Sequence, residues 1–367
     1  MLEICCLLTE GVETMATSQV EGEGLFNFDK GLFNEEVNKL CQQALSKFDN
    51  IIKAYVMFNM VFLGIALLEF LFLIIFITLL SKSSGLAICL ALLFLTSFTY
   101  FVLRLYFQAQ KPEKFLELRD QYLEACKSLL NYQEDIPEHH MALASAACRF
   151  VASLHEKEYS FYKPAEWLEV FSPTMEKFSC WWHWKDLHKM KELMLHASVD
   201  EHIKLVKCEP TNLEVHATLA NAYVILSSLY VDPRKVEGFD EDRWIPQEQF
   251  SEEMQEKFRA TAERAIEEFK ILNDYAPQDP WVHVQLAYSY HDLQMPEEEI
   301  REYEMILKLR PNDKETLFKL GMLYFQQGLN SKGLRVYEEL KHSHYKKAES
   351  LIKFYGAYPY YLLVVDE

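Results

Sequence analysis

The sequence predicts an all-α fold, in which a transmembrane α-hairpin is followed by an α-solenoid of helix pairs. Two long apolar segments, separated by four residues, predict the hairpin, and a period of 34 residues near the C-terminus predicts the solenoid. The 367 residues include only 11 glycines and 12 prolines, fewer than the roughly 7% and 5% of average proteins. So few turn-forming residues favour long helices over short strands.

The two apolar segments are residues 55–80 and 85–103. The first contains a single charged residue, Glu69, and the second contains none. A helix needs about 20 predominantly apolar residues to span a bilayer, so each segment is long enough. Because only residues 81–84 connect them, the two helices are expected to pack antiparallel.

Basic residues near the ends of the spans predict the orientation, because Lys and Arg gather on the cytoplasmic side of membrane helices. Those outside the hairpin are Lys47, Lys53, Arg104, Lys111, Lys114 and Arg119, whereas Lys82 alone lies in the turn. We therefore expect an integral membrane protein with both termini on the cytoplasmic side. Tyr55, Tyr100 and Tyr106 are placed to form an aromatic belt at that interface.

Glu69 is the intramembrane polar residue, near the middle of the bilayer, where a carboxylate is costly. It could be a proton or ion site, a polar contact that joins hairpins into a homo-oligomer, or a carboxyl packed against Thr96 or Ser97 of the second span. No second ionisable residue lies in either span, which weakens the transport reading.

Composition also excludes several classes of function. The formal net charge of −18 argues against a nucleic-acid partner, since phosphate binding requires clustered Lys and Arg. The eight cysteines are scattered without zinc-site spacing, and Cys180, His183 and His188 lack an evident fourth ligand. No phosphate-binding glycine loop or nucleophile motif is found. We therefore predict no cofactor, no metal, no catalytic residue and no enzymatic activity.

The C-terminal third repeats with a fixed period. Pro277 and Pro311, Leu286 and Leu320, and Tyr290 and Tyr324 are each 34 residues apart. This is the period of a helix-turn-helix unit that buries its apolar face against its neighbours.

These residues resemble the tetratricopeptide repeat (TPR) family. The copy over residues 314–340 carries Leu-Gly-x-x-Tyr at Leu320, Gly321 and Tyr324, with a turn glycine at Gly328. A second copy begins at Pro280, and an earlier one after Pro210 is interrupted by an acidic insertion. The expected repeat core is Leu219, Tyr223, Phe269, Leu286, Tyr290, Tyr303, Leu320, Gly321, Tyr324 and Tyr337. A glycine at 321 is expected because a side chain there would separate the two helices of its unit.

The patterns divide the chain into five parts. They are a polar leader with a short helix (1–50), the two-span hairpin (51–107), a helical region with a degenerate repeat (108–209), TPR-like repeats (210–344) and a capping helix with a tail (345–367). Within the repeats the units are 210–277, which contains the insertion at about 231–264, 280–311 and 314–344.

The TPR resemblance implies a peptide-binding groove lined by the first helix of each unit. Carried over position by position, the candidate groove residues are Asn221, Trp281, Val284, Tyr288, His291, Phe318, Met322 and Phe325. Some members of the family clamp a C-terminal carboxylate, but only Asn221 has suitable chemistry here. The other positions are largely apolar or aromatic, so the resemblance implies an apolar concave groove and a partner protein or peptide with an apolar segment.

We thus predict a membrane-anchored scaffold or adaptor that mediates protein–protein interaction on the cytoplasmic face. Two alternatives stay open. The short-looped hairpin also resembles, in shape, the bilobed hydrophobic domain of secreted bacterial inclusion-membrane proteins, which would display the repeats to a host cytosol. The other is a membrane enzyme or transporter that uses Glu69.

Overall fold

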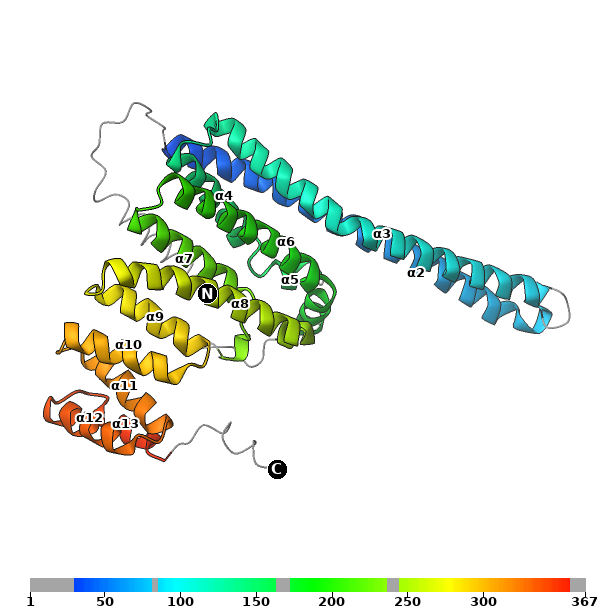
Figure 1. The fold of residues 1–367 in the computed structure, drawn as a ribbon. Helices are drawn as coiled ribbons and strands as arrows, with labels where there is room; N and C mark the ends of the chain where they lie inside the picture. The colour runs from blue at the N-terminus through cyan, green and yellow to red at the C-terminus, as the bar shows by residue number, and fades with distance from the viewer. Residues whose placement is uncertain (1–29, 81–84, 163–171, 236–243, 357–367) are drawn as a thin grey trace. The chain divides into compact units, whose positions relative to one another are not determined.

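The computed structural model describes residues 30–80, 85–162, 172–235 and 244–356. All regular structure in these ranges is helical, which confirms the predicted all-α class. The described residues form two compact units, residues 30–201 and residues 202–356 (Figure 1). The leader before residue 30 and the tail after residue 356 lie outside the described residues.

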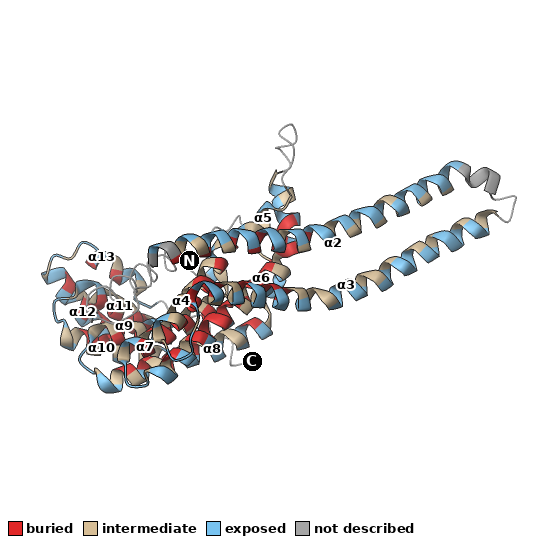
Figure 2. Cartoon of the chain, turned by 90° about the horizontal axis from the view of Figure 1, so that it is seen from above, coloured by how far each residue is buried: buried red, intermediate tan, exposed pale blue. Residues whose placement is uncertain are grey.

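The first unit is organised by two long helices, α2 (Lys30–Leu80) and α3 (Gly85–Leu130). Each helix is amphipathic over one part and apolar over the other. The apolar parts are mostly exposed or half-exposed, in contrast to the buried bundle at their other end (Figure 2). Both helices are long and apolar enough to cross a membrane.

Side chains hold α2 and α3 in antiparallel register along the apolar parts. The Tyr55 hydroxyl donates to the Phe107 carbonyl at 2.5 Å, and the Tyr100 hydroxyl donates to Asn59 Oδ1 at 3.0 Å. Further along, Thr96 Oγ1 donates to Glu69 Oε1 at 2.8 Å. The two apolar helices therefore form the hairpin that the sequence predicts.

The polar halves of α2 and α3 pack with α4 (Pro137–Ser153), α5 (Lys157–Ser160) and the first part of α6 (Ser172–Cys208). One core unites them through Phe48 of α2, Phe115 of α3, Phe150 of α4 and Met190 of α6. The sequence prediction placed a short helix in the leader, apart from residues 108–209. In the structure that helix is continuous with the first span and shares its core with those residues.

The second unit is a series of antiparallel helix pairs, stacked in chain order (Figure 1). The pairs are α7 (Leu213–Ser228) with α8 (Glu252–Tyr275), α9 (Pro280–Asp292) with α10 (Pro296–Leu309), and α11 (Lys314–Gln326) with α12 (Asn330–His342). Asn212, Asp279 and Asp313 cap the first helix of each pair by accepting backbone N–H bonds, which fixes where each pair begins.

The insertion predicted at about 231–264 lies between the helices of the first pair. It includes two short 3-10 turns, η2 (Pro233–Lys235) and η3 (Gln247–Phe250), and the start of α8. The Gln249 side chain donates to the carbonyls of Leu229 and Val231 at 3.2 and 2.9 Å, which ties η3 to the end of α7. Residues 236–243 lie outside the described ranges.

Two glycines set the close packing at the C-terminal end. A Cβ at Gly321 of α11 would meet Val336 of α12 and Leu351 at 2.8 Å each. The expectation that Gly321 permits close helix packing is consistent with this contact, and Leu351 adds a second reason. Leu351 belongs to α13 (Ala348–Leu351), which with η4 (Ile352–Phe354) packs against α11.

Gly333 of α12 is equally restricted, since a Cβ there would lie 2.6 Å from the Phe325 ring. We predict that Gly333→Ala destabilises the second unit by about 1 kcal/mol. Alanine favours a helix over glycine by about 1 kcal/mol, but overpacking a core costs about 1–3 kcal/mol. Urea unfolding of the detergent-solubilised protein measures the difference. Ser331→Ala, at an exposed position of the same helix, is the matched control and should not destabilise the unit.

Candidate functional site

The predicted groove residues lie on α7, α9 and α11, the first helices of the three pairs. Asn221 is half-buried on α7, and Trp281 on α9 packs edge-on against Phe269 of α8, with ring centroids 6.0 Å apart. Val284 and Met322 are partly buried against the C-terminal core. His291 is exposed, with its Nδ1 3.1 Å from Glu299 Oε1.

Phe325 does not line a groove, so this expectation is wrong. Its side chain is fully buried, enclosed by Gly333 and by the Tyr355 ring at 5.6 Å. Phe325 does lie on the first helix of its pair, as its periodic position predicts. Its side chain is buried because the C-terminal segment folds back over the last turn of α11.

The same C-terminal segment covers part of the third pair. The Tyr345 ring lies 6.1 Å from that of Phe318, while Leu351 and Phe354 belong to the core cluster around α11. Phe318 is therefore a packing residue at the edge of the cap, not a freely exposed contact. Accessible groove positions are concentrated nearer to α9.

Tyr288 is the most exposed aromatic of the predicted groove, with 46% of its surface accessible. Lys319 Nζ donates to its hydroxyl at 3.1 Å and lies 5.2 Å from the ring centroid. Sequence reasoning described the groove as apolar because Lys319 is outside the positions carried over from the family. The structure adds this cation, so the surface presents an aromatic ring beside a positive charge.

The predicted repeat core falls largely where a core should lie. Phe269, Leu286 and Leu320 are almost completely buried, and so are the rings of Tyr290, Tyr303 and Tyr324. Leu219 and Gly321 are also buried, whereas Tyr223 and Tyr337 are half-buried at the edges of their pairs. These side chains join neighbouring pairs and are not available to a ligand.

A repeated histidine contact, which sequence reasoning missed, fastens the helix pairs. His216 and His283 are each the fourth residue of their helix, α7 and α9. Each directs Nδ1 to a glutamate of the following helix, Glu268 or Glu302, at 2.7 Å. Each directs Nε2 to a backbone carbonyl six residues earlier, at 3.1 Å for Pro210 and 3.0 Å for Pro277.

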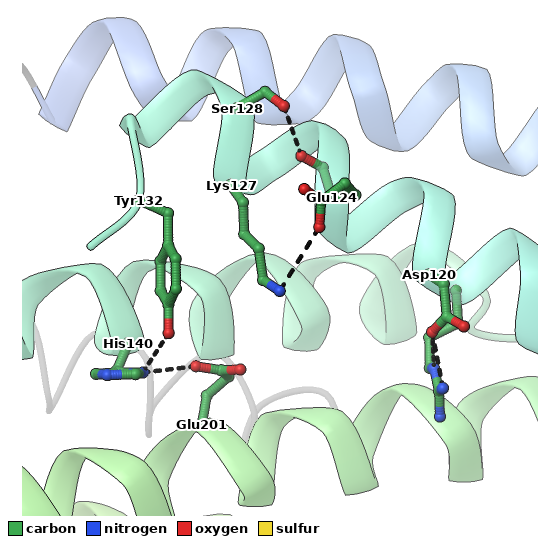
Figure 3. Close-up of polar contacts among 8 residues, drawn as sticks. Asp120, Glu124, Lys127, Ser128, Tyr132, His140 and Glu201 are labelled. Carbon is green, nitrogen blue, oxygen red and sulfur yellow. Dashed lines mark hydrogen bonds and ion pairs between the residues drawn. The ribbon is translucent and has the colours of Figure 1, made fainter. Parts of the chain in front are cut away.

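The first unit contains the same arrangement at His140, the fourth residue of α4. Its Nδ1 lies 2.6 Å from Glu201 Oε2 of α6, and its Nε2 lies 2.9 Å from the Glu134 carbonyl. Tyr132 approaches the same ring nitrogen as Glu201 (Figure 3). The pair formed by α4 and α6 thus shares a contact with the later pairs that no leucine or tyrosine spacing revealed.

The geometry determines the protons in these contacts. A carbonyl oxygen can only accept, so Nε2 must carry hydrogen, and a second proton must lie between Nδ1 and the carboxylate. For His216, burial is the largest influence and opposes the charge. The hydrogen bonds to Glu268 and Pro210, with the charge of Glu268, outweigh it and raise the pKa of His216 above its ordinary value.

The sequence did carry a signal for this contact. A histidine stands six residues after proline at both Pro210 and Pro277, and a glutamate follows on the next helix. The spacing predicts a shared local geometry once the helix start is known. Pairing across a 52-residue separation, as in His216 and Glu268, requires the tertiary structure.

Glu69 adopts the arrangement in which its carboxyl bonds the second span through Thr96. Its second oxygen, Oε2, is buried without a hydrogen-bond partner within the described residues. The carboxyl therefore joins the two helices of one hairpin through one of its two oxygens.

The Cys180–His188 segment is occupied by packing contacts. His183 Nε2 lies 3.1 Å from the Tyr162 hydroxyl, and the His188 ring stacks on Trp184 with centroids 4.6 Å apart. Burial, helped by the positive charge of Lys111, lowers the pKa of His183 to about 4. No group of three or more His, Cys, Asp or Glu side chains in the described ranges is arranged to hold a metal ion.

No protein-family model matches the chain, and no curated protein matches it.

The contact between His216 and Glu268 predicts a pH dependence. Because the pKa of His216 is raised on folding, the stability that it contributes is present below the unfolded pKa of about 6.5 and is lost as pH rises through the folded pKa. As pH rises through the folded pKa, amide hydrogen exchange in α7 and α8 of the full-length protein should accelerate. The increase should be larger than the increase of the intrinsic exchange rate over the same pH range. Glu268→Gln should flatten that response.

Glu267→Gln, at the exposed neighbouring position, is the control and should keep the response of the natural protein. An unchanged pH response in Glu268→Gln would contradict the assignment of the proton to this pair.

Proposed function

We propose that the protein is a membrane-anchored scaffold, in which the α2–α3 hairpin holds the array of helix pairs at the cytoplasmic face and the array binds a partner protein. Under this proposal the protein acts by binding, without catalysis, and the TPR-like pairs supply the surface. The observation that carries the proposal is the union, in one chain, of an exposed apolar hairpin with a series of repeated helix pairs.

The exposure of the hairpin supports insertion into a bilayer. Between Met57 and Leu105, about twenty large apolar side chains have 41–73% of their surface accessible. Fully burying one such side chain is worth about 1.5–3 kcal/mol, so leaving them in water would forfeit of the order of 20 kcal/mol. That exceeds the whole folding stability of a typical domain, about 5–15 kcal/mol. Lipid is the solvent that such a surface fits.

The distribution of basic residues supports the orientation. Lys47 and Lys53 precede the first span, and Arg104 and Lys111 follow the second. By the positive-inside rule these ends, with both termini and the helix pairs, are cytoplasmic, and the turn at residues 81–84 is on the opposite side.

The surface around Tyr288 supports partner binding. Tyr is one of the residue types enriched at binding hot spots, and an exposed ring offers a partner apolar area with one polar group. A carboxylate clamp is not expected here, because only Asn221 among the predicted groove residues has suitable chemistry and the nearby Lys319 is bonded to Tyr288. We propose that the partner presents an apolar segment that packs on the Tyr288 ring.

The orientation can be tested by labelling with a membrane-impermeant maleimide in sealed inside-out vesicles, followed by mass spectrometry of the labelled peptides. Cys208 is exposed in the structure and should react from the outside of these vesicles. In the variant Ser83→Cys, the introduced thiol in the turn should react only after the vesicles are permeabilised. Reaction of the thiol at position 83 in intact vesicles would contradict the proposed topology.

The binding surface can be tested by proximity labelling from the C-terminus in the natural cell. Tyr288→Glu should weaken capture of the main labelled partner at least tenfold, because a hot-spot residue contributes about 2 kcal/mol or more. Tyr275→Glu is the matched control, since Tyr275 is 73% exposed on α8 and is not a predicted groove residue. Equal labelling by both variants would exclude this surface.

A further inference from the structure

The N-terminal end of α6 presents three aromatic side chains that the proposed scaffold does not use. Phe178, Trp181 and Trp182 form this aromatic edge, with ring centroids 5.5–6.1 Å apart. Phe178 is 45% exposed and Trp181 is 58% exposed. On the opposite side of the helix, Cys180 and His183 are buried. The edge is therefore a contiguous apolar surface on a helix that is otherwise anchored by its buried face.

Contacts within the first unit show which way α6 points. Its later part lies beside α4, with Ser198 at 3.4 Å from Cys148 and Glu201 at 2.6 Å from His140. Its earlier part reaches the portion of α3 that follows the second span, where Asp186 forms an ion pair with Lys111. From Glu201 to Asp186 the helix thus approaches the apolar hairpin, and the aromatic edge lies beyond Asp186 in the same direction.

The other neighbours agree with this direction. The Glu158 carbonyl accepts a hydrogen bond from Ser179 Oγ at 2.7 Å, next to the aromatic edge. Lys157, the residue before Glu158, pairs with Asp49 of α2 at 3.0 Å. Asp49 lies a few residues before the start of the first span. In both overall views, α5 lies on the side of the bundle from which the hairpin leaves (Figures 1 and 2).

Helix geometry places the edge close to the start of the spans. With a rise of about 1.5 Å per residue, Lys111 is about 12 Å from the end of the apolar segment at Leu103. With the same rise per residue along α6, Trp182 and Trp181 are about 6–8 Å beyond Asp186, and Phe178 is about 12 Å beyond it. The headgroup layer is about 5–8 Å thick on each side of the hydrocarbon core. Where α6 runs alongside α3, these rises bring the aromatic edge within or beside that layer.

We propose that the aromatic edge of α6 rests in the headgroup region of the bilayer that the hairpin enters, as a second membrane contact beside the spans. This inference rests on the proposed membrane insertion. Trp and Tyr are favoured at this depth because their rings are apolar with one polar group. The exposed Lys177 and Lys185 flank the edge and suit lipid phosphates.

The residues packed behind the aromatic edge also suit a contact with the bilayer. The low pKa of His183, caused first by burial and then by the nearby charge of Lys111, keeps its ring neutral at physiological pH. Lys111 is itself paired with Asp186 and lies 4.5 Å from the Tyr55 ring centroid. The bilayer contact would therefore bury aromatic surface without burying an unpaired charge. It would also hold α6, and with it the helical bundle of the first unit, at a fixed tilt to the bilayer.

Tryptophan fluorescence offers a direct test, because all six tryptophans follow residue 166 and none lies in either apolar segment. The full-length protein is reconstituted at low density into phosphatidylcholine vesicles that contain a headgroup nitroxide quencher. We expect a substantial part of the emission to be quenched. Trp181→Phe with Trp182→Phe should lower the quenched amplitude at least twofold, and Trp281→Phe, in the second unit, should leave it unchanged.

Displacement of the edge is tested with Phe178→Glu, which keeps both reporter tryptophans. Its quenched amplitude should fall, because a carboxylate among the rings opposes entry into the headgroup layer. Absence of quenching in the natural protein, or equal quenched amplitudes in the natural and double-variant proteins, would overturn the proposal.

Carbonate extraction of the same vesicles separates this inference from the proposed anchoring. Protein that stays in the membrane but shows no quenching refutes the aromatic contact alone. Protein that carbonate removes refutes the inserted hairpin as well.

Discussion

The antiparallel pairing of α2 and α3 is the contact on which the first unit depends. The same two helices supply the apolar hairpin and half of the bundle core, so the register set by Tyr55 with Phe107 and by Phe48 with Phe115 extends through both. A helix satisfies its own backbone hydrogen bonds and can therefore pass from an aqueous to an apolar environment without interruption. Pro112 lies inside α3 just beyond the spans, yet the helix continues to Leu130.

The second unit depends on a different kind of contact, which is repeated between successive helices. Each pair buries leucine and tyrosine side chains against the next, and in the first two pairs a histidine and a glutamate fasten the first helix to the second. Burial of an ionisable pair is weak evidence for stability by itself. The histidine–glutamate contact instead fixes position. Both ring nitrogens face acceptors, so the start of the first helix is held against the second helix of the pair.

Several features of the fold follow directly from local sequence patterns. Two apolar segments with a four-residue connection can only form a hairpin, and the 34-residue spacing of Leu286 with Leu320 places both in the core. Other features depend on contacts distant in sequence. The helix at residues 30–54 joins the bundle because α4 and α6 offer it an apolar face, and Phe325 is buried because the chain returns over α11.

The sequence by itself determined the all-helical class, the apolar hairpin and the register of the last two helix pairs, because these depend on hydrophobic length and periodicity. Only the tertiary structure decided which periodic positions are accessible, as for Tyr288 and Phe325. It also brought Lys319 to Tyr288, Glu268 to His216 and Asp186 to Lys111. The physical reason is that accessibility and pairing depend on which surfaces meet, and helical periodicity specifies a face without specifying what covers it.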